Sequence, residues 1–335
     1  MHHKKNIHSV IFLILLQLLF TKVYAMQIHE PEYYLKLNMQ ACPRFVDING
    51  IEVERNLDAQ SSSAEIPINH WIRNGENTIS FHYGPEDFVK ARINEHSTCN
   101  FAVWVKGTLG GRDVNFKVAD LDYNPNYNLP EKERHKNSSP AGHYKLENNQ
   151  TVLSTSPADF EIGEVQIGSG EFESVAGRIY RTFTANVPFP EWAFFSAEHL
   201  SYYPSTDDGY EAMKNKLWPM VLELWKLFET QDMEKILPLF EARSKEIDIA
   251  YYHEPGYTLK SLEADLKNVY TQKYPLDRRA EDEMQLVVSY NEKLVTLVNA
   301  ATRNGTVIFY VKESDSVIFF DIVWMKKDGK WIVAR

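Results

Sequence analysis

The sequence predicts two domains, an N-terminal antiparallel β-sandwich followed by a C-terminal α+β domain. From about Tyr33 to Phe195, short alternations of apolar and polar residues separated by turn residues predict strands. After Asp207 the apolar residues recur every three or four positions, which predicts helices. The 335 residues also exceed what one hydrophobic core usually organises. We therefore expect the sandwich over residues 26–203 and the α+β domain over residues 204–335.

Residues 1–25 have the organisation of an export signal. Lys4 and Lys5 precede an apolar run of about 11 residues that ends at Phe20, and Ala25 follows a short tail. A transmembrane helix needs about 20 apolar residues, so this run is too short to span a bilayer. We expect cleavage after Ala25 and a periplasmic or secreted mature protein. No second long apolar stretch follows in the sequence, so no membrane anchor is expected after cleavage.

The chain is acidic, with 36 Lys and Arg residues against 46 Asp and Glu residues and a formal net charge of −10. Lys4, Lys5 and Lys22 are the only residues of these types in the signal segment, so the mature chain carries −13. Nucleic acids and anionic membrane surfaces require basic patches. The charge balance therefore disfavours both as partners and permits a cationic partner.

Two cysteines, Cys42 and Cys99, are present. In an oxidising compartment an even pair indicates one disulfide, and the alternative is two buried free thiols. A disulfide here would close a loop of about 57 residues and contribute roughly 4 kcal/mol in the chain-entropy model. The residues around the cysteines lack metal-ligand spacing, so no metal is expected.

The sandwich strands are predicted from turns and alternation. Asn49-Gly50 is the strongest hairpin signal, and a glycine-rich turn occupies residues 107–111. Residues 122–155 are rich in Asn, Pro, Lys, Glu and Ser, which predicts a long exposed loop. The expected strands span residues 45–48, 51–53, 64–68, 78–83, 99–105, 114–118 and 177–185.

One part of this region resembles a known fold. Val46-Asp47-Ile48-Asn49-Gly50 and the later Trp71-Ile72-Arg73-Asn74-Gly75-Glu76-Asn77-Thr78-Ile79 resemble the hairpin and strand entry of galactose-binding-type jelly-roll sandwiches. The resemblance covers about 40 residues and implies the fold only. Many members of that group bind sugars, and others bind partners or brace a neighbouring domain.

The C-terminal region alternates helical and strand signals. Apolar stripes predict one helix around residues 217–228, with Pro219 at its start or at a kink. Asp232 is placed to cap a second helix, and Thr258 or Ser261 to open a third. The expected strands span residues 247–252, 284–298, 306–311 and 317–325, and Asp328-Gly329 turns into residues 331–333.

This order of elements resembles the nuclear transport factor 2-like family. The segments that carry the resemblance are residues 228–240, with an Asp before the second helix, and the closing hairpin at residues 320–333. The resemblance implies an α+β cone, in which a curved sheet and its helices enclose a pocket. The fold hosts enzymes, ligand binders and dimerising modules alike, so it does not decide the function.

The pocket implied by this resemblance supplies the candidate catalytic residues. Strand alternation would place Asp321 among apolar neighbours, where burial would raise its pKa and allow acid or base chemistry. The alternative is a solvated or structurally paired Asp321. His253 lies near a turn and Tyr290 is a further pocket candidate, although both suit purely structural roles. The sequence contains no phosphate-binding loop, HExxH, GxSxG or CxxC motif, so no cofactor is expected.

An aromatic segment joins the two expected domains. We expect it to pack between the domains, and the functional alternative is an exposed edge that docks a partner. Its candidate binding residues are Trp192, Phe194, Phe195, Tyr202 and Tyr203.

These observations favour an exported, non-enzymatic protein-binding protein. One specific form is an immunity-type protein that neutralises a bacterial toxin, which would be a cationic partner for this acidic chain. A first alternative is a small-molecule binder or enzyme that uses the C-terminal cone. A second is a carbohydrate-binding protein in which an exposed Trp71 or Trp104 stacks on sugar.

We predict that the mature chain begins at Met26, because the signal segment ends at Ala25. The intact mass of the exported protein should correspond to residues 26–335. A mass that includes residues 1–25 would contradict the signal assignment.

Overall fold

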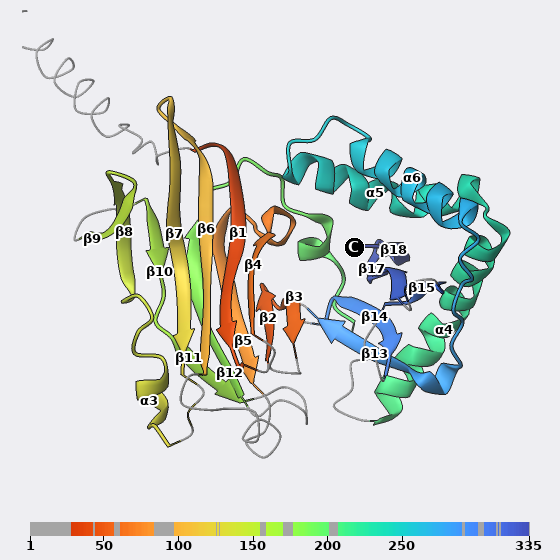
Figure 1. Ribbon diagram of the computed structural model, residues 1–335, viewed down its shortest axis with the longest axis horizontal. Coiled ribbons are helices and arrows are strands. Elements are labelled where there is room, and N and C mark those ends of the chain that lie inside the picture. Colours follow the sequence, from red (N-terminus) through yellow and green to blue (C-terminus); the bar gives the residue numbers. More distant parts are fainter. Residues whose placement is uncertain are drawn as a thin grey trace, which may run out of the picture.

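The computed structural model describes an N-terminal β-rich part and a C-terminal α+β part that lie side by side (Figure 1). The expected signal segment lies outside the described residues. The structure describes residues 28–334 except 43, 57–60, 84–96, 125, 127, 155–158, 170–176, 201–206, 290–291, 301–304, 313 and 315.

Two antiparallel sheets form the N-terminal part. The four-stranded sheet has the order β4-β1-β6-β7, and the eight-stranded sheet has the order β3-β2-β5-β12-β10-β8-β9 with β11 also paired to β12. The strands of the first sheet are β1 His29–Gln40, β4 Ser62–Pro67, β6 Thr98–Leu109 and β7 Arg112–Tyr123. Those of the second are β2 Arg44–Ile48, β3 Ile51–Asn56, β5 Gly75–Tyr83, β8 Gly142–Glu147, β9 Gln150–Ser154, β10 Phe160–Ile162, β11 Gln166–Ser169 and β12 Gly177–Ala185.

Alternation of side chains makes the core between these sheets. Leu35 and Leu37 of β1 point inward with Phe101 of β6, and Ile179 and Phe183 of β12 face them from the other sheet. The residues that alternate with them, Lys36 of β1 and Tyr180 and Thr182 of β12, point outward and are more exposed. The predicted antiparallel sheets of this part are confirmed.

Two-residue turns with left-handed backbone close several hairpins. Asn49 and Gly50 have φ values of 57° and 76° between β2 and β3, and Asn148 and Asn149 have φ values of 50° and 61° between β8 and β9. The second hairpin shows that the predicted loop over residues 122–155 is wrong. That segment contains the β8–β9 hairpin and a short helix, α3 Glu131–Arg134. Its polar composition reflects an exposed hairpin rather than an absence of structure.

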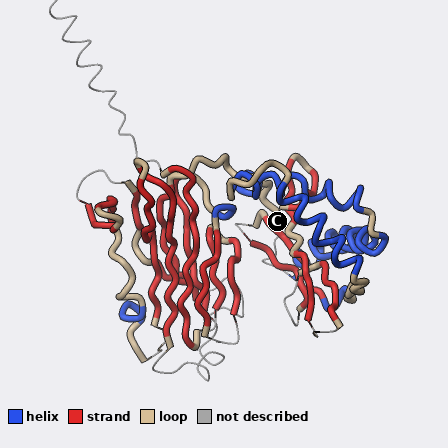
Figure 2. The backbone as a smooth tube through the Cα atoms, turned by 45° about the horizontal axis from the view of Figure 1, so that its top comes forward, coloured by secondary structure: helices blue, strands red, loops and turns tan. Residues whose placement is uncertain are grey.

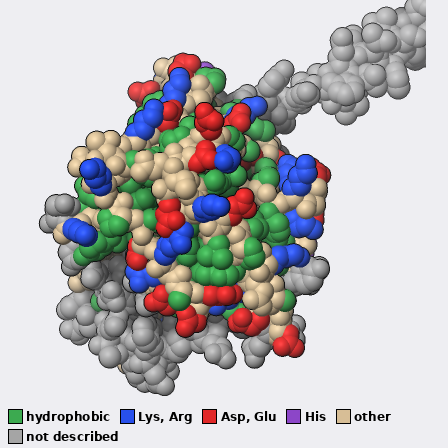
Figure 3. All heavy atoms as spheres, turned by 90° about the vertical axis from the view of Figure 1, so that its right-hand side faces the viewer, with side chains coloured by type: hydrophobic (Ala, Val, Ile, Leu, Met, Phe, Trp, Pro, Cys, Tyr) green, Lys and Arg blue, Asp and Glu red, His purple; other side chains and the backbone are tan. Residues whose placement is uncertain are grey.

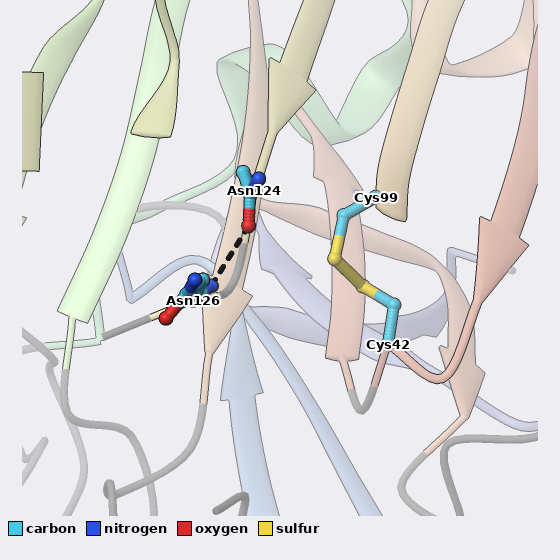
Figure 4. The surroundings of a disulfide bond; sticks show 4 residues. All are labelled: Cys42, Cys99, Asn124 and Asn126. Carbon is cyan, nitrogen blue, oxygen red and sulfur yellow. Dashed lines mark hydrogen bonds between the residues drawn. A yellow bond between two sulfur atoms is a disulfide. The ribbon is translucent and has the colours of Figure 1, made fainter. Parts of the chain in front are cut away.

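A disulfide joins Cys42 and Cys99 (Figure 4). Cys99 lies in β6, and Cys42 follows the end of the neighbouring strand β1, where Met39 pairs with Cys99. Both cysteines are fully buried in the sandwich core. The disulfide therefore fixes the ends of two central strands, as the even pair of cysteines predicts.

A buried arginine connects the two sheets through the core. Arg181 of β12 is 1% exposed among apolar side chains and reaches across to Asp120 of β7. Its guanidinium donates to the carbonyl oxygens of Asp120, Ser139 and Gly163 at 2.7–3.1 Å. Burial lowers the pKa of Arg181 and the Asp120 carboxylate counteracts this effect. These hydrogen bonds join β12 to β7 of the other sheet and to the loops that contain Ser139 and Gly163.

Three helices and a set of antiparallel strands form the C-terminal part (Figure 2). The helices are α4 Asp207–Thr230, α5 Met233–Ala250 and α6 Tyr257–Thr271. The strands are β13 Met284–Ser289, β14 Leu294–Asn299, β17 Trp324–Lys327 and β18 Lys330–Val333 in one sheet, and β15 Val307–Val311 with β16 Ser316–Phe320 in a second. The predicted α+β character of this region is confirmed.

Several elements of the C-terminal part differ from the sequence prediction. Residues 247–250 continue α5 and form no strand, because this end of the helix docks onto the sandwich, where Ala250 is fully buried. The expected strand over residues 284–298 is the hairpin β13–β14, and the one over residues 317–325 divides into β16 and β17. Pro219 lies inside α4, which runs through it.

Aromatic side chains fill the interior of the C-terminal part. Trp225 and Phe228 of α4 and Phe309 of β15 are each no more than 2% exposed. The Trp225 indole donates to the carbonyl oxygen of Thr306 at 2.7 Å, which satisfies its one polar group. Helix α4 is thereby fixed to the β15–β16 sheet.

The two parts meet where the end of α5 contacts the short helix η1 Asn69–Trp71 of the sandwich. The Asn69 amide donates to the carbonyl oxygens of Ala250 and Pro31 and accepts from the backbone N–H of Tyr33. His70 lies 3.2 Å from the carboxylate of Glu246, whose other oxygen accepts from the N–H of Ala193 at 2.6 Å. The join is polar at its centre, where the Asn69 amide uses both of its N–H groups and its oxygen in hydrogen bonds.

The connecting segment runs along the same join. Trp192 is fully buried and its indole donates to the carbonyl oxygens of Asn69 and Ile72. Further along, the Glu198 N–H donates to the carbonyl oxygen of Lys326, and Glu198 accepts from the N–H of Gly329 at 2.6 Å. Trp192 therefore hydrogen-bonds to the N-terminal part and Glu198 to the C-terminal part.

We predict that Glu246→Ala destabilises the protein by about 2 kcal/mol, because it removes the acceptor of the Ala193 N–H and the carboxylate beside buried His70. Urea unfolding measures the loss. Glu241→Ala is the matched control, since Glu241 is exposed on the same helix. Equal stability of the two variants would contradict a structural role for the join.

Candidate functional site

The candidate catalytic residues do not converge on an enclosed site. Ile318 and Phe320 of β16 pack toward the C-terminal core, so the alternation turns Phe319 and Asp321 outward, and Asp321 is exposed just after the strand ends. The burial that acid or base chemistry would need at Asp321 is missing. Tyr290 lies outside the described residues.

His253 belongs to the turn between α5 and α6. It is exposed, its ring packs at a tilt of 54° against Tyr257 with centroids 4.5 Å apart, and its Nδ1 lies 3.9 Å from the Asp248 carboxylate. Asp248 itself is buried and accepts from the N–H groups of Gly256 and Thr258 at 2.7 and 2.9 Å and from the Thr258 hydroxyl. The cluster orders the start of α6.

The predicted binding residues of the aromatic segment lie inside the protein. Trp192, Phe194 and Phe195 are at most 4% exposed and belong to the sandwich core cluster at the join. A partner cannot reach these side chains in this structure. Their placement matches the expected packing between the two parts. Tyr202 and Tyr203 lie outside the described residues.

On the outer face of the four-stranded sheet, polar, charged and aromatic side chains lie side by side in rows. Registration across β4, β1, β6 and β7 gives three adjacent rows of outward residues. The first row is Pro67, Tyr34, Trp104 and Lys117; the second is Glu65, Lys36, Ala102 and Asp120; the third is Ser63, Asn38, Asn100 and Asp122.

A β-bulge determines which residues of β7 stand at the end of these rows. The register between β6 and β7 shifts at Val103 and Trp104, so that Val118 and Ala119 of β7 both point inward. Without the extra residue, Lys117 and Asp120 would project from opposite faces. The bulge places both outward, and the Lys117 ammonium lies 2.6 Å from the Asp120 carboxylate.

Ala102 leaves a hollow at the centre of the face. Its neighbours in the first and third rows, Trp104 and Asn100, are much larger, and so are Lys36 and Asp120 in its own row. The resulting hollow has a volume of about 430 Å³. This size lies in the range of small-molecule sites, and aromatic, amide and charged groups surround it.

Ion pairs hold the rim of this hollow. Lys36 lies 2.9 Å from Glu65 and 4.6 Å from the centre of the Trp104 ring. The hydrogen bond to Glu65 raises the pKa of Lys36, so this ammonium stays charged at neutral pH. Asp120 also accepts from the N–H and hydroxyl of Ser139, so its carboxylate is fixed from behind the sheet.

The second tryptophan proposed for sugar stacking has a different setting. Trp71 is half-buried in η1, at the join between the two parts, and packs against the sandwich core cluster. Of the two candidates, Trp104 alone lines the hollow.

Comparisons with protein-family models, with curated proteins and with solved structures found no match to this chain. Among the described residues, no group of three or more His, Cys, Asp or Glu side chains is arranged to hold a metal ion. In the same part of the chain, no helix is long and apolar enough to cross a membrane.

Sequence reasoning missed the sheet face and its supports. The signals were present in part, since an arginine at an inward position of β12 predicts an acidic partner across the core. The bulge had no such signal, because the apolar pair Val118-Ala119 fits a strand end equally well.

We predict that Asp248→Asn destabilises the protein by about 2 kcal/mol at pH 7, because an amide NH₂ would face one of the N–H donors. Burial alone would raise the pKa of Asp248, but its hydrogen bonds to Thr258 and Gly256 outweigh burial and hold the pKa below the usual value for an aspartate. Its contribution is therefore complete above about pH 4 and is lost as the pH falls further.

Unfolding free energies of the parent protein and Asp248→Asn from pH 7 to pH 2 test this prediction. The difference between them should shrink below pH 4. Asp265→Asn, at an exposed position of α6, is the control and should change little. A difference that stays constant with pH would contradict the assigned role of the carboxylate.

Proposed function

We propose that this chain is an exported, non-enzymatic protein-binding protein, and in its specific form an immunity-type protein that neutralises a bacterial toxin. The finer fold assignments belong to the same proposal. Helices α4–α6 followed by β13–β18 support a nuclear transport factor 2-like domain, and the two antiparallel sheets support a jelly-roll type of sandwich.

The observation that carries the proposal is the apolar surface of the helical layer. Leu222 of α4 is 44% exposed and Leu239 of α5 is 39% exposed, and Ile249 and Tyr257 are exposed on α5 and α6. Figure 3 looks onto the end of the molecule formed by the C-terminal part and shows hydrophobic side chains gathered in patches between charged ones. Apolar patches with polar rims are typical of protein-binding surfaces.

One apolar stripe of α4 reaches this surface from the core. Trp218, Leu222 and Trp225 share one side of the helix at spacings of four and three residues. Trp225 is buried against β15, Trp218 is half-buried, and Leu222 projects into solvent. The stripe thus begins in the core and continues onto the surface, where a partner side chain could extend the packing.

The net charge of the chain specifies the kind of partner. A formal charge of −10, or −13 without the expected signal segment, speeds association with a cationic protein and repels acidic ones. A toxin that acts outside the cytoplasm would have to be neutralised there, which is where the predicted signal would place this chain.

The disulfide supports the same location. Disulfides persist in the periplasm and outside cells and are rare in the cytosol. The bond between Cys42 and Cys99 therefore agrees with export of the chain.

We predict that the mature chain forms a stable complex with the product of a neighbouring gene and suppresses its toxicity. Purified proteins should co-elute, and co-expression should rescue growth. The affinity should fall at least tenfold in the double variant Leu222→Glu/Leu239→Glu, because two charges would enter the apolar surface.

Leu153→Glu is the matched control. Leu153 is 58% exposed on β9 of the sandwich, far from the helical layer in sequence and on the other part of the molecule (Figure 1). It should bind as the parent protein does. Absence of a complex and of rescue would refute the immunity-type role, and equal loss in the control would refute the helical layer as the binding surface.

A further inference from the structure

The hollow at Ala102 lies on the sandwich, away from the helical layer proposed to bind a protein. Its floor is the Ala102 methyl group, which is 5% exposed, together with the surrounding sheet. One wall is the half-buried Trp104 indole. Floor and wall together offer an apolar contact for one flat face of a ligand.

The opposite wall offers neutral hydrogen-bonding groups. Asn38 and Ser63 are exposed beside the hollow, and within the part of the chain that the structure describes their side chains make no hydrogen bond. Asn100 donates one N–H to Asp122 at 2.9 Å, and its second N–H and its amide oxygen remain for a ligand. An amide and a hydroxyl each donate and accept, so they suit hydroxyl groups of a ligand.

The charges of the rim balance one another, which favours a neutral ligand. Two ammonium groups and two carboxylates line the hollow, and they are paired one to one as Lys36 with Glu65 and Lys117 with Asp120. The hollow therefore carries no net charge that would attract an anion or a cation. A neutral polar ligand can accept from the ammonium groups while each pair stays intact.

The site is also rigid before any ligand arrives. The bulge of β7 fixes Lys117 and Asp120, and buried Arg181 and Ser139 hold the Asp120 carboxylate from the core side. The disulfide at Cys99 lies one residue before Asn100 on the same strand. A preformed site loses little conformational entropy on binding.

We propose that this hollow is a carbohydrate-binding site for a neutral sugar unit. The aliphatic C–H face of a pyranose ring lies against the Trp104 ring in the place of the Lys36 ammonium, which in this structure lies 4.6 Å from the ring centre, and the edge of the sugar lies over Ala102. The hydroxyl groups around the ring exchange hydrogen bonds with Asn38, Ser63 and Asn100, and accept from Lys36. A volume of about 430 Å³ holds one or two sugar residues.

The test is binding of the mature protein to an array of neutral, acidic and amino-group-bearing glycans, followed by titration calorimetry with each neutral glycan that binds. Two variants test the site, one by removing a contact surface and one by filling the hollow. Trp104→Ala removes the stacking surface, and Ala102→Leu fills the hollow while leaving every polar group in place. Thr108→Ala is the control, because Thr108 is outward on the same strand beyond the hollow.

We expect neutral glycans to bind, a loss of at least tenfold in affinity in both variants, and unchanged binding in the control. Circular dichroism and unfolding midpoints confirm that the variants fold. Absence of neutral-glycan binding on the array overturns the proposal, as does binding restricted to acidic or cationic glycans. Loss of the protein partner in Trp104→Ala would also overturn it, since the hollow would then belong to the protein interface. Failure here leaves the helical-layer proposal unaffected, because its variants lie on the other part of the molecule.

Discussion

The arrangement of the molecule depends on one fully buried asparagine at the join between its parts. Asn69 is 0% exposed, and its amide uses both donor and acceptor groups, toward Tyr33 and Pro31 of the sandwich and toward Ala250 at the end of α5. A buried amide without these partners would cost roughly 1–3 kcal/mol, so the sandwich strand and the helix must meet in this one geometry. Two further hydrogen bonds lie at the same join. The Trp192 indole of the connecting segment donates to the Ile72 carbonyl, and Glu246 of α5 accepts from the Ala193 N–H.

This fixed join determines which surfaces are available for binding. The aromatic side chains Trp192, Phe194 and Phe195 of the connecting segment are buried in the core at the join. Two separate faces then remain for binding. One is the helical layer, where apolar side chains stay exposed, and the other is the outer face of the four-stranded sheet, where a small residue among large ones leaves a hollow. The two proposals are assigned to these two faces.

The sequence predicted elements whose signals are local. The Asn49-Gly50 and Asp328-Gly329 turns, the inward alternation of residues 177–185 and the cysteine pair all specify their structure within a few residues or through one covalent bond. It mispredicted places where a distant contact decides. Residues 247–250 carry strand-like residues but remain helical, because Asn69 bonds to the Ala250 carbonyl and Thr258 bonds to the Asp248 carboxylate from outside this turn. Asp321 faces solvent because Phe320, its neighbour, packs on Phe228.

The candidate site could be predicted less well than the fold. Trp104 was recognisable as an outward tryptophan, but the hollow depends on Ala102 lying opposite Lys36 and Asp120, which only strand register determines. The β7 bulge then decides that Lys117 and Asp120 share a face, and a shift of one residue would have hidden one of them.

The central claim is that the Asn69 contact holds the two parts as one rigid unit. The most direct measurement is the distance distribution between spin labels at Leu153→Cys on β9 and Leu239→Cys on α5, with the native cysteines joined in their disulfide. A single narrow distribution is expected, with clear broadening when Asn69→Ala is added. A broad distribution in the parent protein, or a narrow one unchanged by Asn69→Ala, would contradict the account.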